Sequence, residues 1–190
     1  MARFKLIVTG DMEKLALHKS LQRIFSPNKR DGEKVIWEQP RKIQCATSHQ
    51  LSPTRTPSGP MKQLVKAMIA EAGIGKKGEP ADLVVVIDDV ELGNLGRENI
   101  IAAHFQNAMQ HELNKYNTKT IQRYQSILRQ KCSFHLLKPM VESYVFGDIN
   151  ALRVAGVPKG VSPKILLTGL VSPTRLVRAP LTQIFIHLNQ

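Results

Sequence analysis

The chain has 190 residues, which is the size of a single domain with at most a short appendage. Its formal net charge of +12 favours a polyanionic partner, with nucleic acid ahead of an anionic membrane surface. Hydrophobic residues make up 42% of the chain, which is enough for a buried core, yet no apolar run approaches the ~18 residues of a membrane span.

Two cysteines, Cys45 and Cys132, lie far apart in the sequence and have no Cys-x-x-Cys spacing. This usage is typical of a reduced, intracellular protein. The first apolar run, residues 6–8, is too short for the hydrophobic region of a signal peptide. We therefore expect a cytoplasmic protein that has no membrane partner.

The beginning of the chain predicts two short strands joined by a helix. Residues 4–8 form an apolar strand, and residues 35–37 form a second one. Between them, Asp11 is a suitable N-cap for a helix whose apolar face includes Ile24 and Phe25.

The middle of the chain predicts a long loop, a helix and a buried strand. Residues 39–60 are rich in Pro, Ser and Thr and predict a loop that is longer than most connections in compact domains. Residues 61–72 have the spacing of a strongly amphipathic helix, which Gly73 would end. Residues 82–88 contain a continuous aliphatic run, which is typical of a strand buried on both faces of a parallel sheet.

The remaining elements complete an alternation of strands and helices. Helices are predicted at 98–116 and 121–128, a strand at 133–137, and further helices after Pro139 and Asp148. This order predicts an α/β fold of three layers, with a central, mostly parallel sheet of about four strands and helices on both faces.

The composition changes near residue 160. Residues 1–160 carry the alternating elements and are predicted to form one α/β domain. Residues 161–190 contain three prolines, several cations and no acidic residue, and they show no clear periodicity. We expect them to form a basic, irregular C-terminal tail.

Three carboxylates follow the buried strand, at Asp88, Asp89 and Glu91. Ligands of open α/β sheets bind outside the carboxyl ends of the strands, which is where these side chains would lie. Carboxylates this close raise one another's pKa values or recruit a cation. The cluster therefore indicates a functional site.

Two classes of magnesium-binding protein that share such a strand are excluded. A Walker B strand requires a Gly-x-x-x-x-Gly-Lys-Ser/Thr loop upstream. The closest sequence, Gly-Ile-Gly-Lys-Lys at residues 73–77, lacks both the spacing and the hydroxyl. A phospho-receiver domain requires an aspartate at the end of a later strand, and residues 133–137 contain none.

Two short segments resemble those of a known fold. Residues 6–13 are Leu-Ile-Val-Thr-Gly-Asp-Met-Glu, and residues 87–91 are Ile-Asp-Asp-Val-Glu. They stand where the Toprim fold of topoisomerases, primases and overcoming-lysogenization-defect nucleases has its first strand and its paired-acid motif. Residues 86–91, with Lys-Pro-Met-Val-Glu-Ser-Tyr-Val-Phe-Gly-Asp at residues 138–148, resemble more narrowly the bacterial Toprim-like family designated domain of unknown function 4276. The resemblance runs from Phe4 to about Lys159.

This resemblance implies a divalent-metal nuclease or phosphodiesterase that acts on DNA or RNA, and by analogy a role in defence against phage. The implied catalytic residues are Glu13, Asp88 and Asp89. The implied ligands of Mg²⁺ or Mn²⁺ are Asp88, Asp89, Glu91 and Glu142, although on sequence alone Glu142 is as well explained by a favourable interaction with a helix dipole. The resemblance also leaves open a partner ATPase.

One position departs from the Toprim pattern. The usual catalytic Glu at the end of the first strand is replaced by Thr9, and Glu13 follows one helical turn later. A positioned acid or base typically contributes ~10²–10⁴-fold to a rate. Two alternatives therefore remain: a nuclease in which Glu13 substitutes for the missing acid, or a non-catalytic nucleic-acid-binding or regulatory module.

Cations in and near the long loop predict a surface for nucleic acid. They are Arg41, Lys42, Arg55, Lys62, Lys76 and Lys77. Contacts of Lys and Arg with phosphates give sequence-independent, salt-sensitive binding. The alternative is a solvated linker that has no partner.

Overall fold

The structure is a computed structural model of the chain, and it describes residues 2–25, 35–54, 56–75, 79–138 and 149–154. A short helix, α6, covers Ile149–Val154, where the sequence predicts one. The predicted helix start at Pro139, the predicted N-cap Asp148, the domain boundary near residue 160 and the predicted tail lie outside the described residues.

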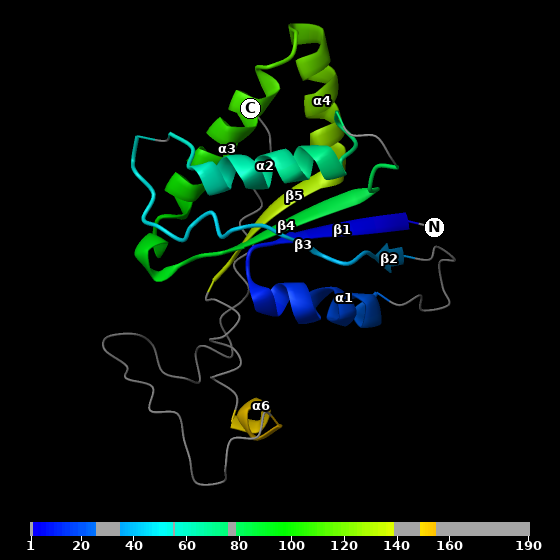
Figure 1. Cartoon of the computed structure of the whole chain (residues 1–190), viewed down its shortest axis with the longest axis vertical. Helices are drawn as coiled ribbons and strands as arrows, with labels where there is room; N and C mark the ends of the chain where they lie inside the picture. The colour runs from blue at the N-terminus through cyan, green and yellow to red at the C-terminus, as the bar shows by residue number, and fades with distance from the viewer. Residues whose placement is uncertain (1, 26–34, 55, 76–78, 139–148, 155–190) are drawn as a thin grey trace.

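A parallel sheet of five strands forms the middle layer (Figure 1). The strands are β1 (Ala2–Val8), β2 (Val35–Trp37), β3 (Arg41–Lys42), β4 (Leu83–Asp89) and β5 (Cys132–Leu137). Their order is β2-β1-β4-β5, with β3 also beside β1, and each of these pairs is parallel. The predicted parallel sheet is confirmed, with one short strand more than the sequence indicates.

The additional strand, β3, lies within the segment that the sequence predicts as a loop. β2 pairs with the first residues of β1 and β3 pairs with its last two, so both follow the same edge. Pro40 lies between them, and proline has no N–H to donate to a ladder. The N–H groups of Glu38 and Ile43 each donate to a β1 carbonyl at 2.9 Å. Arg41 and Lys42 therefore belong to the sheet and not to a loop.

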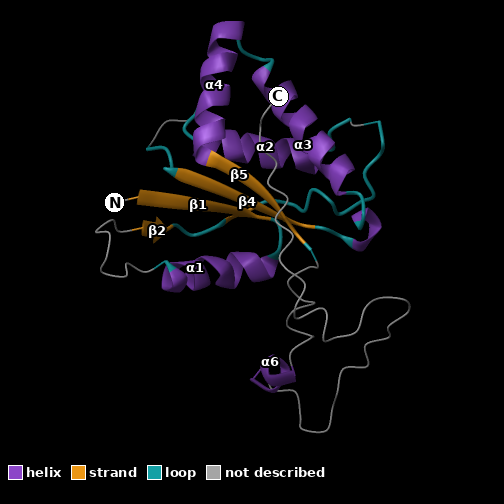
Figure 2. Ribbon diagram, turned by 180° about the vertical axis from the view of Figure 1, so that it is seen from behind, coloured by secondary structure: helices purple, strands orange, loops and turns teal. Residues whose placement is uncertain are grey.

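Helices cover both faces of the sheet. On one face, a π-helical turn at Glu13–Leu17 leads into α1 (His18–Ile24). On the other side lie α2 (Gly59–Glu71), α3 (Glu98–Leu113) and α4 (Thr118–Lys131), as the view from behind in Figure 2 also shows. The predicted arrangement of three layers is confirmed.

Local sequence explains the ends of two of these helices. The hydroxyl of Ser58 accepts a hydrogen bond from the N–H of Met61 at 3.2 Å and caps α2. Beyond α2, Gly73 adopts a φ of +89°, a left-handed conformation that other residues rarely adopt. The side chain of Asn117 accepts from the N–H of Thr120 at 2.9 Å and caps α4.

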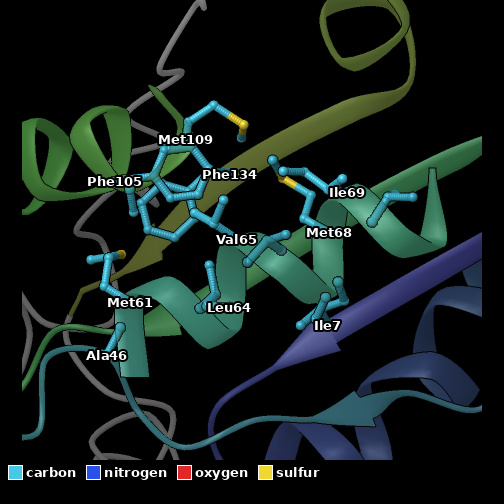
Figure 3. Packing of buried hydrophobic residues seen from close by; sticks show 14 of the residues in the cluster. Ile7, Ala46, Met61, Leu64, Val65, Met68, Ile69, Phe105, Met109 and Phe134 are labelled. Atoms are coloured by element: carbon cyan, nitrogen blue, oxygen red, sulfur yellow. The ribbon is translucent and has the colours of Figure 1, made fainter. Parts of the chain in front are cut away.

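The main core lies between the sheet and α2 and α3. Figure 3 shows the side chains of Leu64, Val65 and Met68 from α2 pointing toward this layer, together with Phe105 of α3 and Phe134 of β5. The two phenylalanine rings stack with centroids 4.2 Å apart. Because the apolar stripe of α2 has the helical period, the sequence predicts this buried face correctly.

The helix that follows β1 differs from its prediction. Ile24 is 69% exposed and Phe25 is 52% exposed, although the sequence predicts both on the apolar face. A π-helical turn carries more residues than an α-helical turn, so the residues beyond it are rotated relative to the 3.6-residue pattern. No side-chain cap is present at the start of the π-helical turn, and the carboxylate of Asp11 instead pairs with Lys42 at 2.5 Å.

The two cysteines are free and half-buried. Burial raises the pKa of Cys132 to about 12, so this thiol stays protonated at neutral pH. No helix in the described part of the chain is both long and apolar enough to cross a bilayer.

Candidate functional site

The connections of the sheet reverse direction between β1 and β4. After β1 the chain passes through α1 and returns as β2 on one side of β1; after β3 it passes through α2, on the opposite face, and returns as β4 on the other side. In open α/β sheets, ligands bind at such a switch point, outside the carboxyl ends of the strands. Thr9, Gly10 and Glu13 follow β1 at this edge, and Asp88 and Asp89 end β4.

The two adjacent aspartates point to opposite faces of the sheet, because successive side chains of a strand alternate. Asp88 continues the face of Val84 and Val86, which belong to the core beneath α2 and α3. Asp89 lies on the α1 face, beside Gly10. The structure therefore separates the acid pair that the sequence predicts at positions 88 and 89.

Glu13 and Asp89 form a different pair of carboxylates. Both side chains are buried, with exposed fractions of 2% and 7%. A Cβ atom built on Gly10 would lie 1.8 Å from Oε2 of Glu13 and 2.8 Å from Oδ2 of Asp89. Both oxygens therefore lie close to the Cα of Gly10. Because both distances are measured from the same point, the distance between the two oxygens cannot exceed the sum of the two. Glu13 reaches this position from the first residue of the π-helical turn, a local widening that is frequent at functional sites.

Asp88 is fully buried and is held by the segment at residues 45–47. Its Oδ1 accepts hydrogen bonds from the N–H of Ala46 at 3.3 Å and from the thiol of Cys45 at 3.5 Å. Burial raises the pKa of Asp88 to about 6, although the side chain of Thr9 and the N–H of Ala46 favour the charged form. Burial, followed by the charge of Asp88, raises the pKa of Cys45 to about 11, so the thiol remains a donor.

Thr9, the residue at which the sequence resemblance predicts an acid, directly follows β1. Its side chain is buried, and its hydroxyl oxygen accepts a hydrogen bond from the N–H of Asp89 at 3.3 Å. This bond ties the end of β1 to the end of β4. Thr9 thus positions the backbone beside the carboxylates and supplies no ionisable group of its own.

Two buried polar residues without a signal in the sequence organise this edge of the sheet. The hydroxyl of Thr47 donates to the carbonyl of Asp89. Nδ2 of Asn94 donates to the carbonyls of Thr47 and His49 at 2.9 Å, and its Oδ1 accepts from the N–H of Leu51 at 3.0 Å. These contacts join residues more than forty positions apart in the chain. Single Thr and Asn residues in a turn-rich sequence form no periodic pattern, so the sequence does not reveal them. Only the unusual length of the predicted loop indicates that this segment has a role.

Replacing Asn94 by Ala should destabilise the fold. The substitution leaves the carbonyls of Thr47 and His49 and the N–H of Leu51 without their partner in a buried position, which costs about 2–4 kcal/mol of unfolding free energy. Urea unfolding measures this change, and Ser48→Ala, at an exposed position of the same segment, is the control. Equal stability of the two variants would show that Asn94 does not hold the segment.

The remaining predicted metal ligands lie apart from the Glu13–Asp89 pair or are not described. Glu91 is half-buried at the start of a 3₁₀ turn (Leu92–Asn94), and its N–H donates to the hydroxyl of Thr47 at 3.4 Å. Its charge raises the pKa of Asp88. Glu142 lies outside the described residues.

The carboxylates of this site fit Mg²⁺ only as a site with two protein ligands. Among the residues that the structure describes, no group of three or more His, Cys, Asp or Glu side chains is arranged to hold a metal ion. Mg²⁺ is commonly bound by one or two carboxylates, with water and substrate phosphates completing its six ligands. Glu13 and Asp89, with oxygens that converge over Gly10, satisfy that requirement.

The predicted nucleic-acid-binding cations are partly neutralised. Arg41 pairs with Glu71 at 3.0 Å, and Lys42 pairs with Asp11. Lys62 is half-buried in the first turn of α2. Arg55, Lys76 and Lys77 lie outside the described residues. The described part of this surface therefore offers less free positive charge than the sequence suggests.

Comparison of the chain with family models gives no match, and comparisons with curated proteins and with solved structures reveal no significant similarity.

Proposed function

We propose that this protein is a divalent-metal-dependent phosphodiesterase that cleaves nucleic acid, with Glu13 and Asp89 as its metal ligands. The observation that carries the proposal is the convergence of two buried carboxylates over Gly10, at the switch point of a parallel sheet. Two acids in such proximity favour a bound cation or a shared proton. The net charge of +12 supports a polyanionic substrate.

Each residue of the site has a distinct role in this proposal. Glu13 and Asp89 would hold Mg²⁺ or Mn²⁺, which when bound neutralises the charge of a phosphate and polarises it toward attack. Gly10 leaves the space that both carboxylates occupy. Thr9 orients the backbone of Asp89, and Asp88 holds the neighbouring segment at Ala46. Asp88 is assigned a positioning role because its Oδ1 is already engaged by Ala46 and Cys45.

A metal titration tests the proposal most directly. Mg²⁺ or Mn²⁺ should raise the melting temperature of the purified protein, because a ligand that binds only the folded state stabilises it. At a hundredfold excess over the dissociation constant the gain is about 2.7 kcal/mol, which corresponds to a rise of roughly 5–10 °C for a chain of this size. The double variant Glu13→Gln/Asp89→Asn should show no rise and should not cleave nucleic acid.

A matched pair of acids provides the control. Glu79 and Asp82 lie before and at the start of β4, at the opposite end of the strands, and both are exposed. Glu79→Gln/Asp82→Asn removes the same charge and should retain the metal-induced rise. An equal response of wild type and both double variants to metal would refute the proposed site.

The non-catalytic alternative has one specific observation in its favour. Thr9 stands in place of an acid, and its hydroxyl is engaged by the N–H of Asp89. A nucleic-acid-binding or regulatory module would bind nucleic acid in EDTA and show neither metal stabilisation nor cleavage. The metal titration, paired with a binding measurement in EDTA, distinguishes the two functions.

A further inference from the structure

The outward face of α4 carries only polar and basic side chains. From residue 119 onward its exposed residues are Lys119, Gln122, Arg123, Ser126, Arg129 and Gln130. They recur at intervals of three, four or one residues and therefore lie along one side of the helix. The opposite side is apolar and packs on the core, with Leu128 buried and Ile121, Tyr124 and Ile127 partly buried against it. Packing thus determines which side faces solvent.

This face belongs to a long stretch of the chain, residues 113–141, that contains no acidic residue. Between Glu112 and Glu142 there are six cations and no Asp or Glu. The cations are Lys115, Lys119, Arg123, Arg129, Lys131 and Lys138. A run of this kind concentrates positive potential on the element that carries it.

The cations of this face are also free of local ion pairs. Lys119, Arg123 and Arg129 form no salt bridge with the described part of the chain, whereas Arg41 and Lys42 of β3 are paired with Glu71 and Asp11. A cation without an acidic neighbour is available to a phosphate without first breaking an intramolecular pair. Lys119, Arg123 and Arg129 are therefore more available to a phosphate than Arg41 and Lys42 are.

The side chains of this face distinguish among polyanions. A helix that lies on an anionic membrane inserts apolar side chains between the lipids, and the apolar side of α4 is already buried in the core. Proteins that bind single strands stack the bases on exposed aromatic rings, and the exposed face of α4 has none. Arg, Lys, Gln and Ser are the side chains that contact the phosphates of a duplex.

We propose that the exposed face of α4 binds the phosphate backbone of double-stranded nucleic acid without sequence preference. Charge complementarity favours this partner, because Lys119, Arg123 and Arg129 lie along one side of α4 with no acidic residue among the exposed residues of that helix. The binding surface is separate from the carboxylates: α4 leads into the start of β5, whereas Asp89 ends β4. Val84, which pairs with the start of β5, and Asp89 are five residue steps apart along β4, which corresponds to about 16 Å.

The chain contains a natural control for the test. Lys119-Thr-Ile-Gln-Arg123 on α4 and Lys19-Ser-Leu-Gln-Arg23 on α1 have the same charges at the same spacing. All four cations are exposed, and α1 lies on the opposite face of the sheet. The double variants Lys119→Gln/Arg123→Gln and Lys19→Gln/Arg23→Gln therefore remove equal charge from opposite sides of the protein.

Binding is measured by fluorescence anisotropy with a duplex of about 30 base pairs, roughly 100 Å long. The α4 variant should lose about tenfold or more in affinity near 0.1 M salt, and the slope of log affinity against log salt should become shallower by about 1.8, which is two phosphate contacts. The α1 variant should retain the wild-type slope. Circular dichroism of both variants should match the wild type, because Gln is a good helix former.

Three outcomes would overturn the proposal. The first is equal loss of affinity in both variants, which would make binding a consequence of net charge alone. The second is a wild-type slope in the α4 variant. The third is binding to vesicles that contain phosphatidylserine, dependent on Lys119 and Arg123, in the absence of duplex binding.

This inference deepens the proposed function, since it names the surface that would hold the substrate, but it is tested independently of it. The binding measurement is made in EDTA and so needs no metal. If α4 binds duplex while metal leaves the melting temperature unchanged, the surface stands and the metal site fails. If metal stabilises the protein while the α4 variant binds duplex normally, the metal site stands and the surface fails.

Discussion

Replacing Asp88 by Asn should stabilise the metal-free protein at pH 8 by about 3 kcal/mol. The pKa of Asp88 is raised from an ordinary value of 3.8 to about 6 in the fold, mainly by burial. A tenfold change in an acid dissociation constant corresponds to about 1.36 kcal/mol, so ionising this carboxyl costs roughly 3 kcal/mol more in the folded protein than in the unfolded chain. Asn removes the ionisation, and its side-chain oxygen can still accept the hydrogen bond from the N–H of Ala46.

The sign of the pH dependence follows from proton binding. Between about pH 4 and pH 6 the folded state holds the proton of Asp88 and the unfolded state has lost it, so wild-type stability falls as pH rises through this window. Below pH 4 both states are protonated, and above pH 6 both are ionised and the cost is constant. The advantage of the Asn variant should therefore be absent near pH 4, grow up to pH 6 and remain level to pH 8.

Thermal unfolding in EDTA across this pH range measures the effect. A gain of about 3 kcal/mol corresponds to a rise of roughly 5–10 °C at pH 8 for a chain of this size. Asp82→Asn removes an identical group from an exposed position at the other end of β4 and serves as the control. A variant that is no more stable than wild type at pH 8, or that has the same advantage at pH 4, would contradict the assigned environment of Asp88.

Replacing Gly10 by Ala should disrupt metal binding and leave the fold in place. The added Cβ would lie 1.8 Å from Oε2 of Glu13 and 2.8 Å from Oδ2 of Asp89. The overlapping atoms are the ends of side chains and not backbone, so Glu13 can swing aside at modest cost. The displacement separates the two carboxylates, and the loss of ligand geometry should weaken metal affinity by at least about 10–100-fold.

Gly59→Ala is the matched control, because a Cβ at Gly59 meets nothing within 4 Å. Calorimetric titration with Mn²⁺ should give wild-type affinity for that variant and strongly reduced affinity for Gly10→Ala. Cleavage of nucleic acid should follow the same order. If Gly10→Ala is folded and binds Mn²⁺ as tightly as wild type, Glu13 and Asp89 do not hold the ion together.

Much of the fold was predictable because its signals are local. The apolar run of β4 identifies a strand buried on both faces, and the helical spacing in α2 identifies the face that packs on the sheet. The alternation of these elements predicts a parallel sheet covered on both sides. β3 was missed because the dipeptide Arg41-Lys42 has no strand propensity. It joins the sheet only because the last residues of β1 offer a free edge beside it.

The candidate site was predictable in its composition but not in its geometry. The sequence already showed that β4 ends in acids and that Glu13 follows β1, which placed all of them near one edge of the sheet. It predicted Asp88 and Asp89 as one pair, whereas the structure places them on opposite faces of the sheet. Which of the two meets Glu13 depends on the face that α1 covers and on a π-helical turn that shifts its register, and neither has a sequence signal of its own.

The charged residues likewise have some properties that the sequence determines and others that only the tertiary structure decides. The sequence by itself determined the excess of cations, the acidic cluster after β4 and the long acid-free stretch that includes α4, because these are properties of composition and order. Only the tertiary structure decided that Arg41 is neutralised by Glu71 and that Lys119 and Arg123 form no salt bridge with the described residues. Ion pairs and carboxylate pairs join residues far apart in the chain, and their formation depends on distances of a few ångströms that packing alone sets.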